Sequence, residues 1–223
     1  GSASVSVRKE GRTRRLESPG HYMIGGSYVD ADNDVTAPLT FVGFGVRAPE
    51  MGYDDLAGLD LDGRVVLMFA GAPAHFPHDI RAYYSSGEVK YRTLADLGVV
   101  GAIVVRTREM AEKYSWEDIV RNYAFSGMRW LSPQGEVQGV YPGFEFAVVM
   151  SPAGLEALLA DEEVSADALY DVAESGSTGS RALGVEVQVE RRSTQTLVST
   201  SNVAAILPGT DRCNTRPATS SQR

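Results

Sequence analysis

Apolar residues are concentrated in four short segments, which predict β-strands, and two of these segments, 65–70 and 99–105, are continuous apolar runs. The four segments cover residues 39–46, 65–70, 99–105 and 144–150. A run in which every successive residue is apolar is typical of a strand covered on both faces, as in the centre of a parallel sheet. Two glycines in the first segment, Gly43 and Gly45, indicate a bulge or a close approach of the backbone at that point.

Segments with helical spacing of apolar residues separate these runs. The spacing over residues 91–97 predicts a helix that ends at Gly98, and residues 116–124 predict a second helix. Ser151-Pro152 is typical of an N-cap and the first helical position of a third, and Ser165 is expected to cap a short helix through residue 170. The alternation of strands and helices favours βαβ units.

Alternating patterns at the two ends of the chain predict antiparallel strands. Residues 4–8 and 12–16 flank a Glu10-Gly11 turn and predict a hairpin, whereas residues 30–34 form a polar connector. Valines alternate with polar residues over 185–190, and residues 203–207 predict one more strand. The fold class expected is α/β, with a central, mostly parallel sheet, flanking helices and antiparallel edge strands.

Composition and charge reduce the number of partner classes that this protein could bind. A chain of 223 residues with 21 Lys+Arg and 29 Asp+Glu carries a formal net charge of −8, which argues against nucleic acid and anionic membrane surfaces as partners. No apolar run approaches the roughly 20 residues of a membrane span. Cys213 is the single cysteine, so no internal disulfide forms.

Two clusters contain residue types that bind metals. His75 and His78 offer two imidazoles in a loop predicted after the 65–70 strand. If the protein were a small metallohydrolase, Asp79 or Glu88 would be the acidic partner of these histidines. A solvated loop is the simpler interpretation, because no third histidine lies nearby in the sequence.

The second cluster is acidic and comprises Asp54, Asp55, Asp60 and Asp62. It suits either a calcium loop or acid/base chemistry, but its spacing differs from that of an EF-hand. The favoured interpretation is that these Asp residues and the neighbouring glycines form turns, which end one segment and start the next strand at Val65. The lone Gly43-Phe44-Gly45 opens no helix, and no G-x-S-x-G motif occurs, so no catalytic constellation is complete.

Aromatic and basic residues gather in two segments, 75–86 and 121–141, which are the best candidates for a binding surface. Aromatic residues and arginine are the types that most often anchor interfaces. Both segments are expected as loops that leave strand ends, where α/β folds place binding sites. The candidate residues are Phe76, Tyr83, Tyr84, Arg121, Tyr123, Arg129, Trp130 and Tyr141.

Three stretches together resemble a known family. Residues 37–73 (APLTFVGFGVRAPEMGYDDLAGLDLDGRVVLMFAGAP) and the step from Ala95 through Gly98 to Ile103 are similar to the protease-associated (PA) domain inserted in bacterial M28-family zinc peptidases. Residues 201–209 (SNVAAILPG) resemble the first strand of the peptidase domain of that family.

The resemblance implies a PA-type "swivelling" β/β/α fold and an accessory role in substrate access or in protein or peptide binding. It implies a PA domain (35–190) and a return strand (191–211). The alternating pattern predicts an N-terminal β segment (1–34), and the polar composition of residues 212–223 predicts a disordered tail. No histidine follows His78, so none of the family's zinc ligands can be carried over and zinc is expected only in a separate peptidase domain. That domain and peptide substrates are the implied partners, and export from the cell is the usual setting. A free-standing PA-like binding module is the alternative.

Overall fold

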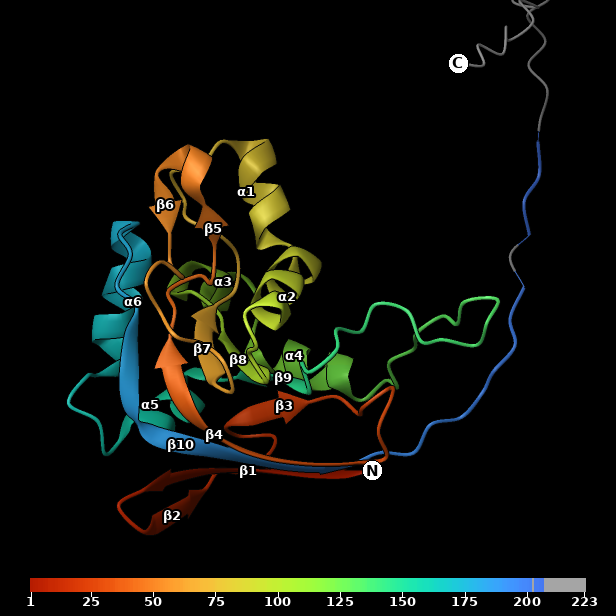
Figure 1. Ribbon diagram of the computed structural model, residues 1–223, viewed down its shortest axis with the longest axis horizontal. Coiled ribbons are helices and arrows are strands. Elements are labelled where there is room, and N and C mark those ends of the chain that lie inside the picture. Colours follow the sequence, from red (N-terminus) through yellow and green to blue (C-terminus); the bar gives the residue numbers. More distant parts are fainter. Residues whose placement is uncertain (202, 207–223) are drawn as a thin grey trace, which may run out of the picture.

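Eight strands form one sheet in the part of the chain that the computed structural model describes, residues 1–201 and 203–206 (Figure 1). The spatial order is β2-β1-β10-β4-β7-β8-β9-β3. The four strands at its centre are parallel neighbours, and antiparallel strands flank them on both sides. The eight strands are β1 (Ser2–Lys9), β2 (Arg12–Arg15), β3 (Tyr22–Ile24), β4 (Asp32–Phe41), β7 (Val65–Phe69), β8 (Gly101–Val105), β9 (Phe146–Met150) and β10 (Arg181–Arg192).

Helices connect β7 to β8 and β8 to β9, which confirms the α/β class. A separate two-stranded ribbon and a short 3-10 helix precede β7, and no helix among the described residues is long and apolar enough to cross a membrane. The remaining elements are β5 (Arg47–Ala48), the 3-10 helix Pro49–Met51, β6 (Tyr53–Asp54), α1 (His78–Ser85), α2 (Gly87–Asp96), α3 (Arg108–Lys113), α4 (Trp116–Tyr123), α5 (Pro152–Leu159) and α6 (Ala166–Ser175).

The apolar run of β7 is explained by packing on both of its faces. Val65, Leu67 and Phe69 belong to the larger apolar cluster, which includes the buried leucines of α5 and α6. Val66 and Met68 belong to a second cluster, which includes Leu94 of α2. Every residue of β7 is buried, so alternation is absent because neither face meets water.

The predicted caps are present. The Ser151 side chain accepts a hydrogen bond from Gly154 N–H, Pro152 starts α5, and Ser165 caps α6, which extends to Ser175 rather than residue 170. Gly98 follows α2 with φ 76°, a left-handed conformation that glycine adopts without steric cost.

Strand β4 begins earlier than its apolar run suggests. It starts at Asp32, so the expected polar connector 30–34 is largely strand, and the chain leaves the sheet after Phe41. Asp32 and Asp34 are exposed, so their carboxylates remain in water within the strand. Pairing with β10 extends β4 as far as Asp32. Residues 42–46 form a tight turn instead, in which Gly45 N–H donates to the Val42 carbonyl at 2.6 Å.

The strand predicted over residues 203–207 is wrong for its described part. Residues 203–206 have no strand structure, and Val203 and Ile206 are 96% and 93% exposed. These residues pair with no sheet edge, and an isolated apolar strand has no stability of its own. Asn202, Leu207 and the expected tail 212–223 lie outside the described residues. The expected domain boundaries, between residues 34 and 35 and between residues 190 and 191, fall inside β4 and β10 respectively.

Candidate functional site

A long irregular segment, residues 124–145, leaves the fold between α4 and β9 and is called here the 124–145 loop (Figure 1). Helix α4 fixes its start. Ser115 and Asp118 form a capping box at the N-terminus of α4, and the Trp116 indole N–H donates to the Pro19 carbonyl at 2.7 Å. The end of the loop is fixed by Glu145, whose N–H donates to the Val100 carbonyl at 2.8 Å.

Side-chain contacts hold the loop to the rest of the fold. The Arg129 guanidinium lies over the Tyr28 ring at 4.4 Å, and the Phe144 ring packs on Tyr91 with centroids 5.0 Å apart. Burial raises the pKa of Tyr91 to about 12, so this phenol stays neutral. The buried Arg191 donates to the Glu145 carbonyl at 2.6 Å. The loop is therefore attached firmly at both ends.

The first part of the loop, residues 125–131, exposes large apolar side chains. Phe125 is 78% exposed, Met128 72%, Trp130 67% and Leu131 41%. A small hairpin shapes this region, because Leu131 and Val137 form an isolated bridge and Gln138 N–H donates to the Trp130 carbonyl at 3.0 Å. Four such side chains within seven residues form a patch of the kind that marks interaction sites.

The structure divides the predicted binding residues between two places. Arg121, Tyr123, Arg129, Trp130 and Tyr141 lie on α4 or the 124–145 loop, whereas Tyr83 and Tyr84 lie on α1, away from the loop in Figure 1. Arg121 is engaged with Asp118, and burial raises the pKa of Tyr123.

The segment 75–86 differs from the exposed loop that the sequence predicts. Residues from His78 onwards form α1, with Pro77 as the N-cap residue. Phe76 is only 4% exposed, so placing it on a binding surface was wrong; its ring meets Tyr53 edge-on at 5.5 Å and fills the core. The Tyr84 hydroxyl donates to Glu50 at 2.6 Å, which raises the pKa of Tyr84 to about 12.

The two histidines do not come together with further metal-binding side chains. The centroid of the His75 ring lies 5.0 Å from that of Phe76 and 6.1 Å from that of Tyr53. His78 is the first residue of α1. Among residues 1–201 and 203–206, no three His, Cys, Asp or Glu side chains form a group that could hold a metal ion.

The acidic cluster serves the turn after β4, as the favoured interpretation predicts. Buried Asp55 accepts hydrogen bonds from Phe44 N–H at 2.9 Å, Val46 N–H at 3.2 Å and the Tyr53 hydroxyl at 2.9 Å. Burial raises the pKa of Asp55 to about 6, and these bonds oppose the rise. Asp54 caps a smaller turn by accepting from Leu56 N–H at 2.9 Å.

Sequence reasoning missed Lys90, a buried lysine on α2. Its ammonium donates to the carbonyls of Phe69, at 3.3 Å, and of Gly71, just beyond the end of β7. Burial lowers the pKa of Lys90 to about 7, and the charge of Asp55 opposes this shift. The signal in the sequence was helical spacing, since Lys90 lies one turn before buried Leu94 and so shares its face.

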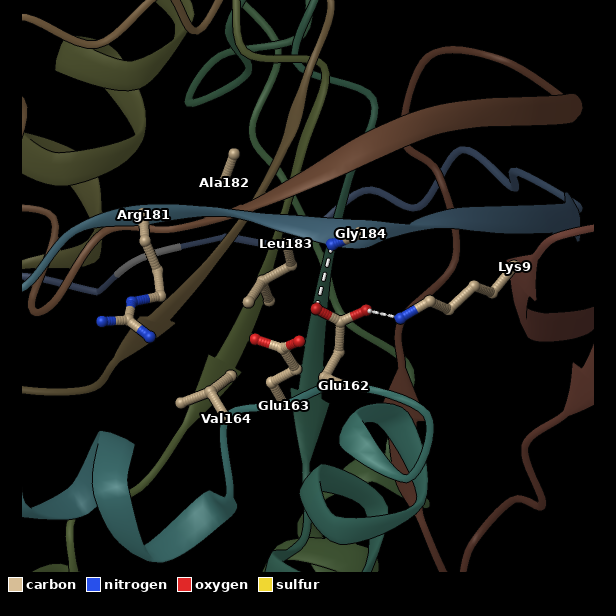
Figure 2. Close-up of a pocket in the computed structure, with 8 residues that line it drawn as sticks. All are labelled: Lys9, Glu162, Glu163, Val164, Arg181, Ala182, Leu183 and Gly184. Atoms are coloured by element: carbon tan, nitrogen blue, oxygen red, sulfur yellow. Dashed lines mark hydrogen bonds and ion pairs between the residues drawn. The ribbon is translucent and has the colours of Figure 1, made fainter.

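A hollow of about 300 Å³ lies between β10 and the segment that follows α5 (Figure 2). Glu162 is central to it, and Figure 2 shows its two carboxylate oxygens pointing to Lys9 and to Gly184. The Lys9 ammonium lies 2.8 Å away and Gly184 N–H donates at 2.9 Å. Both carboxylate oxygens of Glu162 are therefore engaged by Lys9 and Gly184, so Glu162 serves to join β1, β10 and the segment after α5.

Comparison with known proteins assigns no family. No protein-family model and no curated protein matches the chain. Among solved structures, an aminopeptidase from Aneurinibacillus sp. strain AM-1 matches at 19% identity and a TM-score of 0.37. The match covers 84% of this chain and 32% of the aminopeptidase chain. This similarity is too low to establish a shared fold or activity.

Proposed function

We propose that this chain is a non-catalytic accessory module of the PA type, belonging to an M28-like zinc peptidase, and that it binds extended polypeptide through the 124–145 loop. The observation that carries the proposal is the apolar patch in the first part of the loop, where Phe125 is 78% exposed, Met128 72% and Trp130 67%. An apolar patch on a firmly attached loop loses little conformational entropy when a partner covers it.

The resemblance of residues 37–73 to PA domains supports the peptidase context of the proposal. In that context zinc belongs to a peptidase domain outside this sequence, and this chain restricts or guides the approach of substrate. A free-standing binding module uses the same patch and differs only in lacking a peptidase partner.

Fluorescence of Trp130 tests the binding directly. The chain has two tryptophans, so the Trp116→Phe variant leaves Trp130 as the only reporter. We expect a blue shift of its emission when an unstructured, uncharged peptide of about ten residues is titrated in, because the indole leaves water.

Two further variants make the test specific. Phe125→Ser combined with Met128→Ser should weaken binding at least about tenfold. The matched control is Tyr114→Ser, which removes another exposed ring, 52% exposed and outside the loop, and should leave affinity unchanged. Equal binding by the loop variant and the parent chain would refute the proposal. Release of leucine from a leucine anilide by the purified chain would contradict its non-catalytic part.

A further inference from the structure

The β1–β2 hairpin at the opposite edge of the sheet from β3 is strongly basic, in contrast to the acidic chain as a whole. Residues 8–15 (RKEGRTRR) contain five Arg or Lys and one Glu, a local charge of 5 − 1 = +4, within a chain of net charge −8. Arg8, Arg12 and Arg15 are exposed. None of the three forms an ion pair with any residue in the ranges 1–201 and 203–206.

Strand β2 is the last strand of the sheet, and its outer side pairs with no described strand (Figure 1). The pairing with β1 shows which backbone groups face outward. Leu16 N–H donates to the Val5 carbonyl at 2.9 Å, and the same register pairs Val7 with Arg14 and Lys9 with Arg12. Because hydrogen-bonded and non-hydrogen-bonded pairs alternate, the N–H and C=O of Thr13 and Arg15 point away from the sheet.

The charges determine what can pair with this edge. Two copies of β2 side by side would bring arginines together, so the strand resists pairing with itself. The same charges attract an extended segment that carries carboxylates, because cross-strand neighbours of opposite charge stabilise a sheet. At physiological salt the screening length is about 8 Å, so the charges nearest the edge dominate. Asp161 already pairs with Arg14 and Glu186 lies opposite Arg8 on β10, which leaves Arg12 and Arg15 as the arginines nearest the open edge.

Room for side chains lies beside the edge. A hollow of about 280 Å³ is lined by Val7, Lys9, Arg12, Thr13, Arg14 and Asp161. Arg14 is already engaged, since it donates to the Ala157 carbonyl at 2.7 Å and pairs with Asp161 at 2.5 Å. Arg14 thereby fixes β2 against the end of α5, while Arg12 on the same face is left for a ligand.

We infer that β2 is a docking edge for an acidic, extended peptide segment, which adds as a ninth strand through the backbone of Thr13 and Arg15 and pairs its carboxylates with Arg8, Arg12 and Arg15. The main-chain hydrogen bonds provide affinity, and the arginines select acidic sequences. This site is independent of the 124–145 loop, which leaves the fold near the other edge of the sheet (Figure 1).

Titration calorimetry with a capped peptide of about nine residues that repeats Thr-Glu-Glu, so that carboxylates lie on both faces of the added strand, tests the inference on the full chain. We expect saturable binding that weakens as salt is raised from about 50 to about 500 mM, and no binding of the matching threonine–lysine peptide. Arg12→Glu combined with Arg15→Glu should weaken binding at least about tenfold.

Thr13→Pro separates strand addition from simple charge attraction. Proline removes only the outward-facing N–H at this position, and edge strands tolerate proline there, so the variant should fold while losing at least about tenfold in affinity. Arg92→Glu is the control, because it reverses another exposed arginine, on α2, and it should bind the peptide as the parent chain does. Failure of the acidic peptide to bind, or equal affinity of the Thr13→Pro variant, would overturn the inference. Loss of binding in Arg92→Glu would show attraction to the overall charge of the protein rather than to β2, and would equally overturn it.

Discussion

Asp55 offers a quantitative test of what holds the turn between β4 and β7. Replacing it with alanine removes the acceptor of three hydrogen bonds, from Phe44 N–H, Val46 N–H and the Tyr53 hydroxyl. Asp55 is 1% exposed, so water cannot easily replace the carboxylate. Each buried donor left unsatisfied costs about 1–3 kcal/mol, and removing a poorly solvated carboxylate offsets part of the total. We expect Asp55→Ala to lower the free energy of unfolding by about 3 kcal/mol.

The Asp55→Asn variant separates hydrogen bonding from charge. Its amide oxygen can accept from both backbone N–H groups, and its NH₂ can donate to the Tyr53 oxygen, so we expect a loss of about 1 kcal/mol or less. Asp54→Ala is the matched control. It removes one acceptor, that of Leu56 N–H, in a more exposed setting and should cost about 1 kcal/mol.

Urea unfolding followed by far-UV circular dichroism measures these differences. With an m-value of about 2 kcal/mol/M, Asp55→Ala should lower the midpoint by about 1.5 M at unchanged m. A midpoint shift no larger than that of Asp54→Ala would refute the assigned role of the buried bonds. Equal losses in Asp55→Ala and Asp55→Asn would show that the negative charge, rather than the hydrogen bonds, stabilises the turn.

Three further predictions follow from single side chains. Burial lowers the pKa of Lys90 to about 7, from an ordinary value of 10.5. Between these two pH values the unfolded state binds more protons than the folded state, so the free energy of unfolding should rise with pH. Urea midpoints measured across this range should show the rise for the parent chain and lack it for Lys90→Met. Ser151→Ala removes the N-cap of α5 and a 2.8 Å bond to the Gly20 carbonyl, so thermal denaturation should report a loss of about 1–2 kcal/mol, whereas an unchanged melting temperature would contradict the cap. Trp130→Ala should change the free energy of unfolding by less than about 0.5 kcal/mol because the side chain is 67% exposed, and a larger loss would mean that the loop packs on the core.

The sequence alone predicted the elements whose signal is local. The short apolar segments identified β7, β8 and β9, the Ser151-Pro152 pair identified the start of α5, and Gly98 identified the end of α2. Each of these signals depends on backbone geometry or burial within a few residues. The turn role of Asp54 was predicted for the same reason, because Asp54 binds the N–H of Leu56 two positions away. Asp55 instead binds N–H groups nine and eleven positions away, across the turn.

Only the tertiary structure decided what depends on distant neighbours. Asp32 joins β4 because β10, some 160 residues later, supplies a pairing partner, Arg192. Phe76 is buried because Tyr53 lies over it, and residues 203–206 remain without strand structure because they pair with no sheet edge. The candidate sites follow the same rule. The sequence named Arg129, Trp130 and Tyr141 of the 124–145 loop. Which loop residues face water, and that β2 ends the sheet with outward backbone groups, depends on how strands far apart in the chain pair.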